Sequence, residues 1–351
     1  MMKAVRMSRH GGTEVLDYGD YPLPSVGPYD VLVRVEATSV SGWDVKYRLG
    51  SLPQLPGRKS YPLPMQPGRD AAGTVERVGE AVTRFASGDR VVGLVHPANP
   101  TSPLTIRGYS NLSTDIEYPG HSMFGGYAQY VARPESYWLP LPPHVPAAAA
   151  AAAMWSYATS HRVLRSRLEA RLGDVVLVIG ASGGMGSAAL DLARAMGVRT
   201  IAVTRSAAKA SFLLELGAAH VVVLGDDAAA EVRSHGGPLG LDGAVDFSDD
   251  PAMVRFAVST LRPGGTIVIT AGERASEPLP ITALDCIRLE LNVRGVRAST
   301  LDDQRSVVDA LAHGLIHPAI HATMPMSQAR EAQALLEAGA VSGRIVLDPW
   351  Q

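Results

Sequence analysis

A glycine-rich segment between a predicted strand and a predicted helix carries the clearest chemical signal in the sequence. It follows the continuous apolar run Val175–Ile179 and leads into Gly183–Met196, which has a helical pattern. Glycines at such a junction allow a tight turn and a close approach of the backbone to a pyrophosphate, whose charge is attracted to the helix N-terminus. The segment therefore predicts a dinucleotide site made of Ala181, Ser182, Gly183, Gly184, Met185 and Gly186.

Residues at the end of the next predicted strand favour a phosphorylated dinucleotide. Sites specific for NAD place an Asp or Glu about twenty residues after the loop, where it binds the ribose 2′-hydroxyl. Here that place holds Thr204, followed by Arg205, Ser206 and Lys209. These side chains bring no negative charge and offer hydrogen-bond donors to a 2′-phosphate. The pattern favours NADPH over NADH; the alternative interpretation is a solvated basic helix start.

Composition excludes several classes of protein and of site. The formal net charge is −2, so no overall attraction to nucleic acid or to a membrane surface is expected. With the single cysteine Cys286, neither an intrachain disulfide nor a four-cysteine zinc site can form. The apolar run Pro146–Trp155 is too short to span a bilayer, and Met1–Arg6 passes directly into a predicted strand without a signal-like apolar region. A cytoplasmic location is therefore expected.

The 351 residues are enough for two domains, and the pattern changes after residue 137. Residues 1–137 alternate short β-rich runs with Gly/Pro turns, which predicts a strand-rich domain. Residues 138–299 alternate buried strands with helices, which predicts an α/β domain with a doubly wound parallel sheet. Residues 300–351 hold too few elements for a domain, so we expect them to fold back onto the first. The clearest predicted elements are strands Asp30–Glu36, Ala72–Val78, Arg90–Val95, Tyr127–Ala132, Val175–Ile179, Thr200–Thr204, Gly243–Phe247, Gly265–Thr270 and Arg344–Leu347, and helices Ala207–Leu216, Met253–Leu261, Asp302–His313 and Ser327–Glu337.

Three segments with recognisable motifs appear in a characteristic order. They are Pro67–Val75, Val78–Val92 and Gly125–Tyr130. With the glycine loop, they resemble P-x-x-G-H-E-x-x-G-x-V, V-G-x-x-V-x-x-F-x-x-G-D-x-V and G-G-x-A-E-Y of the medium-chain dehydrogenase/reductase superfamily. The resemblance implies a GroES-like catalytic domain in 1–137 and 300–351, a Rossmann NADPH-binding domain in 138–299, and an active site in the cleft between them.

The zinc positions of that superfamily are altered in this sequence. Ser41 stands at the position of the cysteine ligand, Arg69 at that of the histidine ligand, and Trp155 near the third. None of these is a good zinc ligand, and arginine is cationic at any working pH. The stretch that corresponds to the structural-zinc lobe, residues 96–122, has no cysteine. We therefore expect no metal.

The segment Ser41–Gly50 instead resembles N-P-x-D-x-K-x-R-x-G of the zinc-free quinone reductases and zeta-crystallins. Asp44, Lys46 and Arg48 match that pattern, and Ser41 replaces the usual asparagine but can still donate one hydrogen bond to a carbonyl oxygen. A buried salt bridge between Asp44 and Arg48 is an equal alternative to a catalytic role for Asp44.

The resemblance also implies several cofactor contacts elsewhere in the chain. Thr159 corresponds to a threonine beside the nicotinamide, Ala271 and Gly272 to backbone at the carboxamide, and Arg344 to a basic residue that reaches the pyrophosphate. Phe247 and Ser248 end a predicted strand at the carboxyl edge, where open α/β sheets bind ligands.

A site of this kind, without a Lewis acid, suits hydride transfer to a quinone or an α,β-unsaturated carbonyl compound. Ser41, Arg69 or the NADPH ribose would stabilise the developing oxyanion, and Tyr47, Lys46 or water would supply the proton. The alternatives are a metal-free alcohol or ketone oxidoreductase that uses Arg69, and a non-catalytic NADPH-binding protein. Another alternative for Arg69 is a salt bridge to Asp70 or Asp44.

Two further expectations concern the surface. Four loop residues could line a pocket, but exposure to solvent is the simpler expectation for them: His96, Tyr109, Tyr118 and His121. The resemblance implies a homodimer joined through the last strands of the sheet, Gly265–Thr270 and Leu291–Val296, with the apolar run Thr266–Ala271 as an edge that needs covering.

Overall fold

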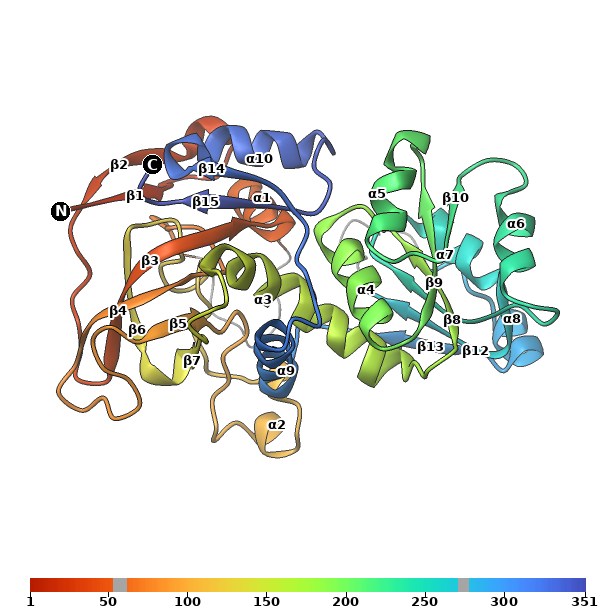
Figure 1. Cartoon of the computed structure of the whole chain (residues 1–351), viewed down its shortest axis with the longest axis horizontal. Coiled ribbons are helices and arrows are strands. Elements are labelled where there is room, and N and C mark those ends of the chain that lie inside the picture. The colour runs from red at the N-terminus through yellow and green to blue at the C-terminus, as the bar shows by residue number, and fades with distance from the viewer. Residues whose placement is uncertain (53–61, 271–277) are drawn as a thin grey trace. The chain divides into compact units, whose positions relative to one another are not determined.

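The computed structural model describes residues 1–52, 62–270 and 278–351, and these form two compact units (Figure 1). The first unit comprises Met1–Ala158 with Ser299–Gln351, and the second comprises Thr159–Ala298. The change in sequence pattern at 137 precedes the first of these divisions because the alanine-rich helix α3 (Ala147–His161) packs largely with the first unit. Its residues Ala150–Ala153 are fully buried.

The first unit is built around strands that largely match the predicted ones. Its strands are β1 (Met2–Arg6), β2 (Asp17–Tyr21), β3 (Asp30–Val40), β4 (Ala72–Val78), β5 (Arg90–Gly93), β6 (Tyr130–Pro134), β7 (Trp138–Pro140), β14 (Ile320–Pro325) and β15 (Arg344–Asp348). Its helices, besides α3, are α1 (Gly42–Leu49), α2 (Pro103–Ile106), α9 (Leu301–Ala312), α10 (Ala329–Glu337) and the 3₁₀ turns Thr13–Val15, Ser110–Leu112, Glu135–Tyr137 and Met326–Gln328.

The C-terminal segment, Ser299–Gln351, belongs to the first unit. The main sheet has the order β14-β15-β3-β4-β5-β7, and β6 also pairs with β3. β15 lies antiparallel to β3, with Ile345 opposite Val40 and Leu347 opposite Thr38, and β14 lies parallel to β15. The sequence did not predict β14, because half of its residues are exposed and the strand carries no clear alternation.

The second unit is a parallel six-stranded sheet with the order β10-β9-β8-β11-β12-β13. Its strands are β8 (Val175–Ile179), β9 (Arg199–Thr204), β10 (His220–Val223), β11 (Leu241–Asp246), β12 (Leu261–Ile269) and β13 (Asn292–Gly295). Its helices are α4 (Gly184–Ala195), α5 (Ala210–Glu215), α6 (Ala228–His235), α7 (Pro251–Val258) and α8 (Ala283–Leu289), with a π-helical segment Arg162–Leu168 and a 3₁₀ turn Ala207–Lys209.

The arrangement of this sheet confirms the doubly wound α/β prediction. Helices α4 and α5 lie on one side of the sheet, and α7 and α8 lie on the other (Figure 1). Every residue of β8 is buried, which explains why its sequence is a continuous apolar run. The chain passes from β8 outward to β10 and returns to β11 beside β8, so the strand order reverses at the β8/β11 junction.

One expectation about the sheet edge is wrong. Residues Gly265–Thr270 belong mostly to β12, which pairs with β11 on one side and with β13 on the other. The apolar character of β12 therefore reflects burial inside the sheet. The edge strand is β13, whose residues are mostly exposed.

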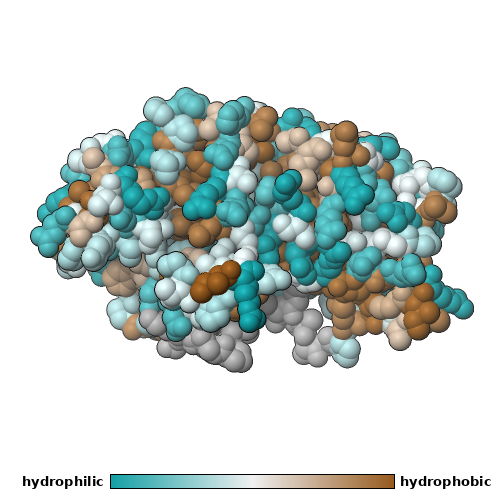
Figure 2. Space-filling view, turned by 90° about the horizontal axis from the view of Figure 1, so that it is seen from below, coloured by the Kyte–Doolittle hydropathy of each residue, from teal (hydrophilic) through white to brown (hydrophobic). Residues whose placement is uncertain are grey.

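Among the described residues, no helix is both long enough and apolar enough to cross a bilayer. Hydrophilic and hydrophobic residues are interspersed over the face in Figure 2, and hydrophobic residues gather toward its right-hand end. Helix α8 in the second unit exposes Leu284 and Ile287 to solvent.

Candidate functional site

Ser41 and Asp44 form the start of helix α1. The Ser41 backbone N–H and Oγ donate to Asp44 Oδ2 at 2.8 and 2.7 Å, and the Asp44 N–H donates back to Ser41 Oγ at 3.3 Å. This capping box explains the spacing of the two residues, because each satisfies a backbone donor of the first helical turn. The Ser41 hydroxyl is therefore already engaged, and Ser41 is almost fully buried.

Asp44 also joins this helix to the loop that carries Arg69. Its Oδ1 accepts a hydrogen bond from the Gly68 N–H at 3.1 Å. Complete burial raises the pKa of Asp44 above its usual value, and the hydrogen bonds from Ser41 and Gly68 oppose that rise. The buried Asp44 thus connects the start of α1 to the loop that carries Arg69.

Arg48 does not pair with Asp44, so the suggested salt bridge between them is wrong. The Arg48 guanidinium donates to Gln333 Oε1 at 2.7 Å and to Glu337 Oε2 at 2.5 Å, both on α10, and to the Gly11 carbonyl at 2.8 Å. Arg48 is completely buried. Its role is to anchor α1 to the C-terminal helix.

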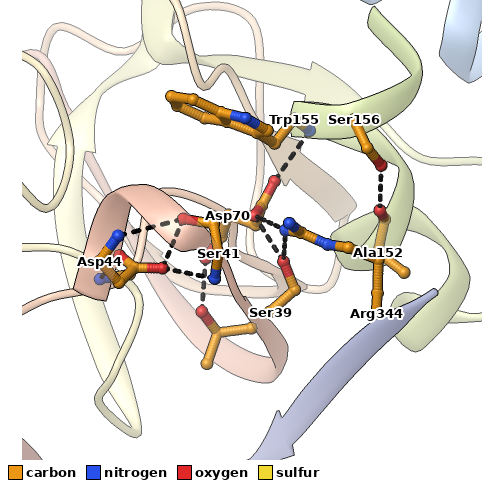
Figure 3. A network of polar contacts seen from close by, with 10 residues as sticks. Ser39, Ser41, Asp44, Asp70, Ala152, Trp155, Ser156 and Arg344 are labelled. Carbon is orange, nitrogen blue, oxygen red and sulfur yellow. Dashed lines mark hydrogen bonds and ion pairs between the residues drawn. The ribbon is translucent and has the colours of Figure 1, made fainter. Parts of the chain in front are cut away.

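A second buried carboxylate, Asp70, organises the network in Figure 3. Asp70 Oδ2 accepts hydrogen bonds from Ser39 Oγ at 2.5 Å and from Arg344 Nη2 at 2.9 Å, and Oδ1 accepts one from the Trp155 backbone N–H at 3.0 Å (Figure 3). Burial raises the pKa of Asp70, and the Arg344 charge opposes the rise. The network fixes Trp155 of α3 relative to the loop of Arg69.

Arg344 is therefore held inside the first unit. Besides the ion pair with Asp70, its Nη2 donates to Ser39 Oγ, and little of the side chain is exposed. The sequence assigned Arg344 to a pyrophosphate; in this structure its charge is balanced by Asp70, and a cofactor role stays a prediction.

Arg69 lies at the centre of a group of aromatic side chains. Its Nη1 is 2.9 Å from His121 Nδ1, and its Nη2 donates to the Val95 carbonyl at 2.9 Å. The guanidinium carbon is 4.7 Å from the Trp155 ring centre and 5.1 Å from that of Tyr118. Arg69 is 4% exposed. In a site with little water, such a cation interacts strongly with any nearby negative charge.

Further aromatic rings surround this group. The Tyr47 and His121 rings are stacked with centroids 5.4 Å apart, and Trp43 lies 6.0 Å from both His121 and Trp155. His96 lies 4.9 Å from Trp155, and its Nδ1 is 2.8 Å from Ser299 Oγ. We call Arg69, His121, Trp155, Trp43, Tyr47 and His96 the Arg69 cluster.

For two members of this cluster the sequence favoured exposure over a place in a pocket. His96 and His121 were expected on exposed loops, but each is only 5% exposed, whereas Tyr109 is exposed as expected. Their loops turn inward: Gln304 of α9 binds both the N–H and the carbonyl of His96. No local pattern marks these histidines. Tyr47, a candidate proton donor, uses its hydroxyl to bind the Pro62 carbonyl at 2.8 Å.

The side chains at the zinc positions do not fit a zinc ion. Ser41 is engaged as a helix cap, Trp155 offers only an N–H donor, and the Arg69 guanidinium has no lone pair and would repel the metal. Among residues 1–52, 62–270 and 278–351, no group of three His, Cys, Asp or Glu side chains could hold a metal ion.

The glycine loop of the second unit fits a dinucleotide. Gly180 has φ +74°, a left-handed conformation suited to glycine, and Gly183 begins α4 with no side-chain cap among the described residues. A Cβ at Gly186 would lie 2.3 Å from the Gly180 carbonyl oxygen and 2.5 Å from Ala181 Cα. The bare backbone therefore packs tightly and leaves the first turn of α4 open to an anion.

The residues assigned to the 2′-phosphate lie at the end of β9. The Ser206 N–H donates to Thr204 Oγ1 at 3.1 Å, which shapes the turn. Lys209 Nζ is 3.3 Å from Ser182 Oγ, so the structure brings the lysine to the glycine loop. Arg205 is exposed and forms a 2.8 Å ion pair with Asp250.

Three strand ends converge beside this loop. The Phe247 N–H donates to the Ile179 carbonyl, and Ser248 binds the buried Asp246 through both its N–H and its Oγ. Thr270 Oγ1 donates to the Asp246 carbonyl at 2.6 Å. Burial raises the pKa of Asp246. Ala271 and Gly272, assigned to the carboxamide, lie outside the described residues.

Thr159 precedes Ser160, which contacts the glycine loop. Ser160 Oγ donates to the Met185 carbonyl of the loop at 3.1 Å. Thr159 is buried, and its Oγ1 has no hydrogen-bond partner within the described part of the chain. A buried hydroxyl without a partner is costly, so its presence near the loop suits contact with a ligand.

Comparison with known proteins supports this description of both units. Residues 27–143 match the family described as "Alcohol dehydrogenase GroES-like domain", and residues 184–313 match "Zinc-binding dehydrogenase". An alcohol dehydrogenase of Rhizobium meliloti (strain 1021) is 30% identical over 94% of each chain. A quinone oxidoreductase of Lama guanicoe is 27% identical over 99% of this chain and 97% of that protein. A Sinorhizobium meliloti 1021 structure described as a zinc-binding dehydrogenase bound to NADP has a TM-score of 0.85 and 27% identity, covering 99% of both chains.

Proposed function

Because the chain belongs to the medium-chain dehydrogenase/reductase superfamily, we propose that it is a zinc-independent, NADPH-dependent oxidoreductase that transfers a hydride to a quinone or an α,β-unsaturated carbonyl compound. The observation that carries the proposal is the Arg69 cluster. A buried arginine occupies the position where zinc-dependent relatives hold a metal ligand, and it is surrounded by aromatic rings.

The residues of the second unit support NADPH as the cofactor. Lys209 contacts the glycine loop, Arg205 and Ser206 directly follow β9, and the last residue of β9 is Thr204, which carries no negative charge. The NADP-bound structural neighbour uses the same fold. NADPH, when bound, supplies the hydride.

The chain's own residues have three tasks in this reaction. Arg69, oriented by His121 and the Val95 carbonyl, stabilises negative charge on the carbonyl oxygen of the acceptor. The rings of Trp43 and Trp155 provide apolar surface for a planar acceptor, and Asp70 holds the backbone of Trp155 in place. The Ser41 and Tyr47 hydroxyls, both occupied in this structure, would have to exchange partners to act on the substrate.

The test is NADPH consumption against a panel of quinones, enones, ketones and aldehydes, with enzyme treated with a chelator. Turnover of quinones or enones that survives chelation is the expected result. With deuterated NADPH, the label should appear at the β-carbon of an enone. Loss of activity on chelation, restored by zinc, would contradict metal independence.

A metal-free alcohol or ketone oxidoreductase is the second candidate, and the 30% identical alcohol dehydrogenase favours it. In that reaction Arg69 would stabilise an alkoxide. Deuterium found at the carbonyl carbon and never at the β-carbon would select this candidate. No turnover of any compound despite tight NADPH binding would indicate a non-catalytic NADPH-binding protein.

We also propose a homodimer and a cytoplasmic location. The edge strand β13 and the exposed Leu284 and Ile287 of α8 supply an uncovered edge and apolar surface in the second unit. Light scattering at micromolar concentration should give twice the mass of the chain; a monomer mass would remove the dimer proposal.

A further inference from the structure

A pocket in the first unit lies apart from the residues assigned to catalysis. It has a volume of about 410 Å³, a size typical of small-molecule sites. Much of its lining is apolar and includes Met2, Leu23, Met123 and Phe124. Polar side chains also line it, among them Arg6 and Gln66.

Arg6 is held in this pocket by aromatic rings. Its guanidinium carbon lies 4.2 Å from the Tyr21 ring centre and 4.4 Å from that of Phe124. The Arg6 Nε is buried without a hydrogen-bond partner, and no ion pair joins Arg6 to a carboxylate among the described residues. A guanidinium placed in this way is oriented by the rings and has no carboxylate partner for its charge within the described residues.

Gln66 adds an unused acceptor. Its Nε2 donates to the Gly125 carbonyl at 2.6 Å, which fixes the orientation of the amide. Its Oε1 is buried and has no hydrogen-bond partner in the part of the chain that the structure describes, although Gln66 is only 1% exposed. An unpaired buried acceptor is costly unless a ligand or water donates to it.

Backbone hydrogen bonds fix the segment that follows Phe124. The Gly125 N–H donates to the Gln66 carbonyl at 2.8 Å, and the Gly126 N–H donates to the Gly68 carbonyl at 2.7 Å. These bonds fix the loop that carries Phe124. A preorganised pocket loses less entropy on binding.

We propose that this pocket binds a small carboxylic acid with an apolar or aromatic body and a hydroxyl or N–H group. The carboxylate would pair with Arg6, the body would pack against Met123 and Leu23, and the hydroxyl or N–H would donate to Gln66 Oε1. A cation would be repelled by Arg6, and a purely apolar compound would leave both polar groups unpaired.

The experiment is calorimetric titration of the full chain with 3-phenyllactate, which carries a carboxylate, a hydroxyl and a phenyl ring. We expect a dissociation constant of about 1 mM or tighter for a ligand of this size. The neutral 3-phenyllactamide should bind roughly 10-fold more weakly, because it lacks the charge-assisted hydrogen bonds.

Variants assign the binding to this pocket. Arg6→Met should weaken 3-phenyllactate binding roughly 10-fold or more, whereas the exposed Arg77→Met on β4 should not change it. Phe124→Leu, at a partly exposed ring, should weaken binding severalfold and serves if Arg6→Met does not fold. Equal affinity of these variants and the wild type, or equal affinity for acid and amide, would overturn the proposal. Because binding is measured without turnover, its outcome is independent of the proposed reaction, and Arg6→Met should keep the wild-type rate of NADPH oxidation.

Discussion

The Arg69 cluster and the glycine loop are assembled in different ways. The cluster combines side chains from distant segments, so that Arg69 meets His121 and Trp155 only after folding. The loop is one contiguous stretch of backbone, Gly180–Gly186, whose shape depends on close contacts between its own atoms. Substitutions should therefore act through charge in the cluster and through steric fit in the loop.

The largest expected effect is on the cluster. Arg69→Met should lower kcat about 100-fold, the scale of losing one oxyanion donor, with a small change in melting temperature. Steady-state kinetics and thermal unfolding of the same preparation test this, with Arg77→Met as the control. A large fall in stability with normal turnover of the remaining folded enzyme would show that Arg69 is structural.

The loop offers a matched pair of glycines. Gly186→Ala places a Cβ 2.3 Å from the Gly180 carbonyl oxygen, whereas a Cβ at Gly183 meets only that oxygen, at 3.5 Å. We expect Gly186→Ala to cost about 1–3 kcal/mol of stability and to weaken NADPH and NADH alike. Gly183→Ala should cost much less. Denaturant unfolding and nucleotide titration measure both, and equal behaviour of the two variants would contradict the steric account.

The preference for NADPH over NADH tests the effect of charge in the second unit, apart from the steric fit of the glycine loop. Arg205→Ala and Lys209→Ala should each weaken NADPH binding roughly 10-fold or more and leave NADH nearly unchanged, because the lost hydrogen bonds are charge-assisted. The ion pair of Arg205 with Asp250 is at the surface and therefore weak, so it should not prevent Arg205 from binding the 2′-phosphate. Equal losses for both cofactors would instead implicate the fold or the pyrophosphate.

The smallest expected effects are on the pH dependence of stability. They come from two capping boxes with the same pattern, Ser41 with Asp44 in α1 and Thr282 with Asp285 in α8. In α8, hydrogen bonds from Thr282 and Arg255 lower the pKa of Asp285 from 3.8 to about 2. Because the folded-state pKa is depressed, the ionised carboxylate stabilises the fold above pH 3.8, and this is lost as the pH falls toward 2. The stability difference between wild type and Asp285→Asn should therefore shrink below pH 4, with the exposed Asp226→Asn as the control.

The box of α1 should behave in the opposite way. Burial raises the pKa of Asp44 from 3.8, so the folded state binds more protons than the unfolded state between 3.8 and the raised value. The free energy of unfolding contributed by Asp44 therefore rises as the pH falls through that window. The stability difference between wild type and Asp44→Asn should change in favour of the wild type on acidification, measured by urea unfolding at a series of pH values from 7 down to the unperturbed pKa of 3.8. A change of the same sign as for Asp285→Asn would show that burial does not control the pKa of Asp44.

The sequence by itself determined the features that depend on neighbours in the chain. The apolar run of β8, the glycines after it and the helix that follows lie where the pattern predicts them, because strand burial and turn sterics are local properties. The sequence equally showed that the residues at two zinc positions, Ser41 and Arg69, are not good zinc ligands. The sequence also predicted that the C-terminal segment folds back onto the first unit, because too few elements remained for a third core.

Only the tertiary structure decided which side chains share a buried site. It placed His121 and His96 beside Arg69 and Trp155, paired Arg344 with Asp70, and turned Arg48 away from Asp44 toward α10. These partners are distant in sequence, and nothing in the neighbouring residues marks them. Burial makes an unpaired charge costly, so these buried charged groups take partners that packing brings within reach, and packing is a property of the whole fold.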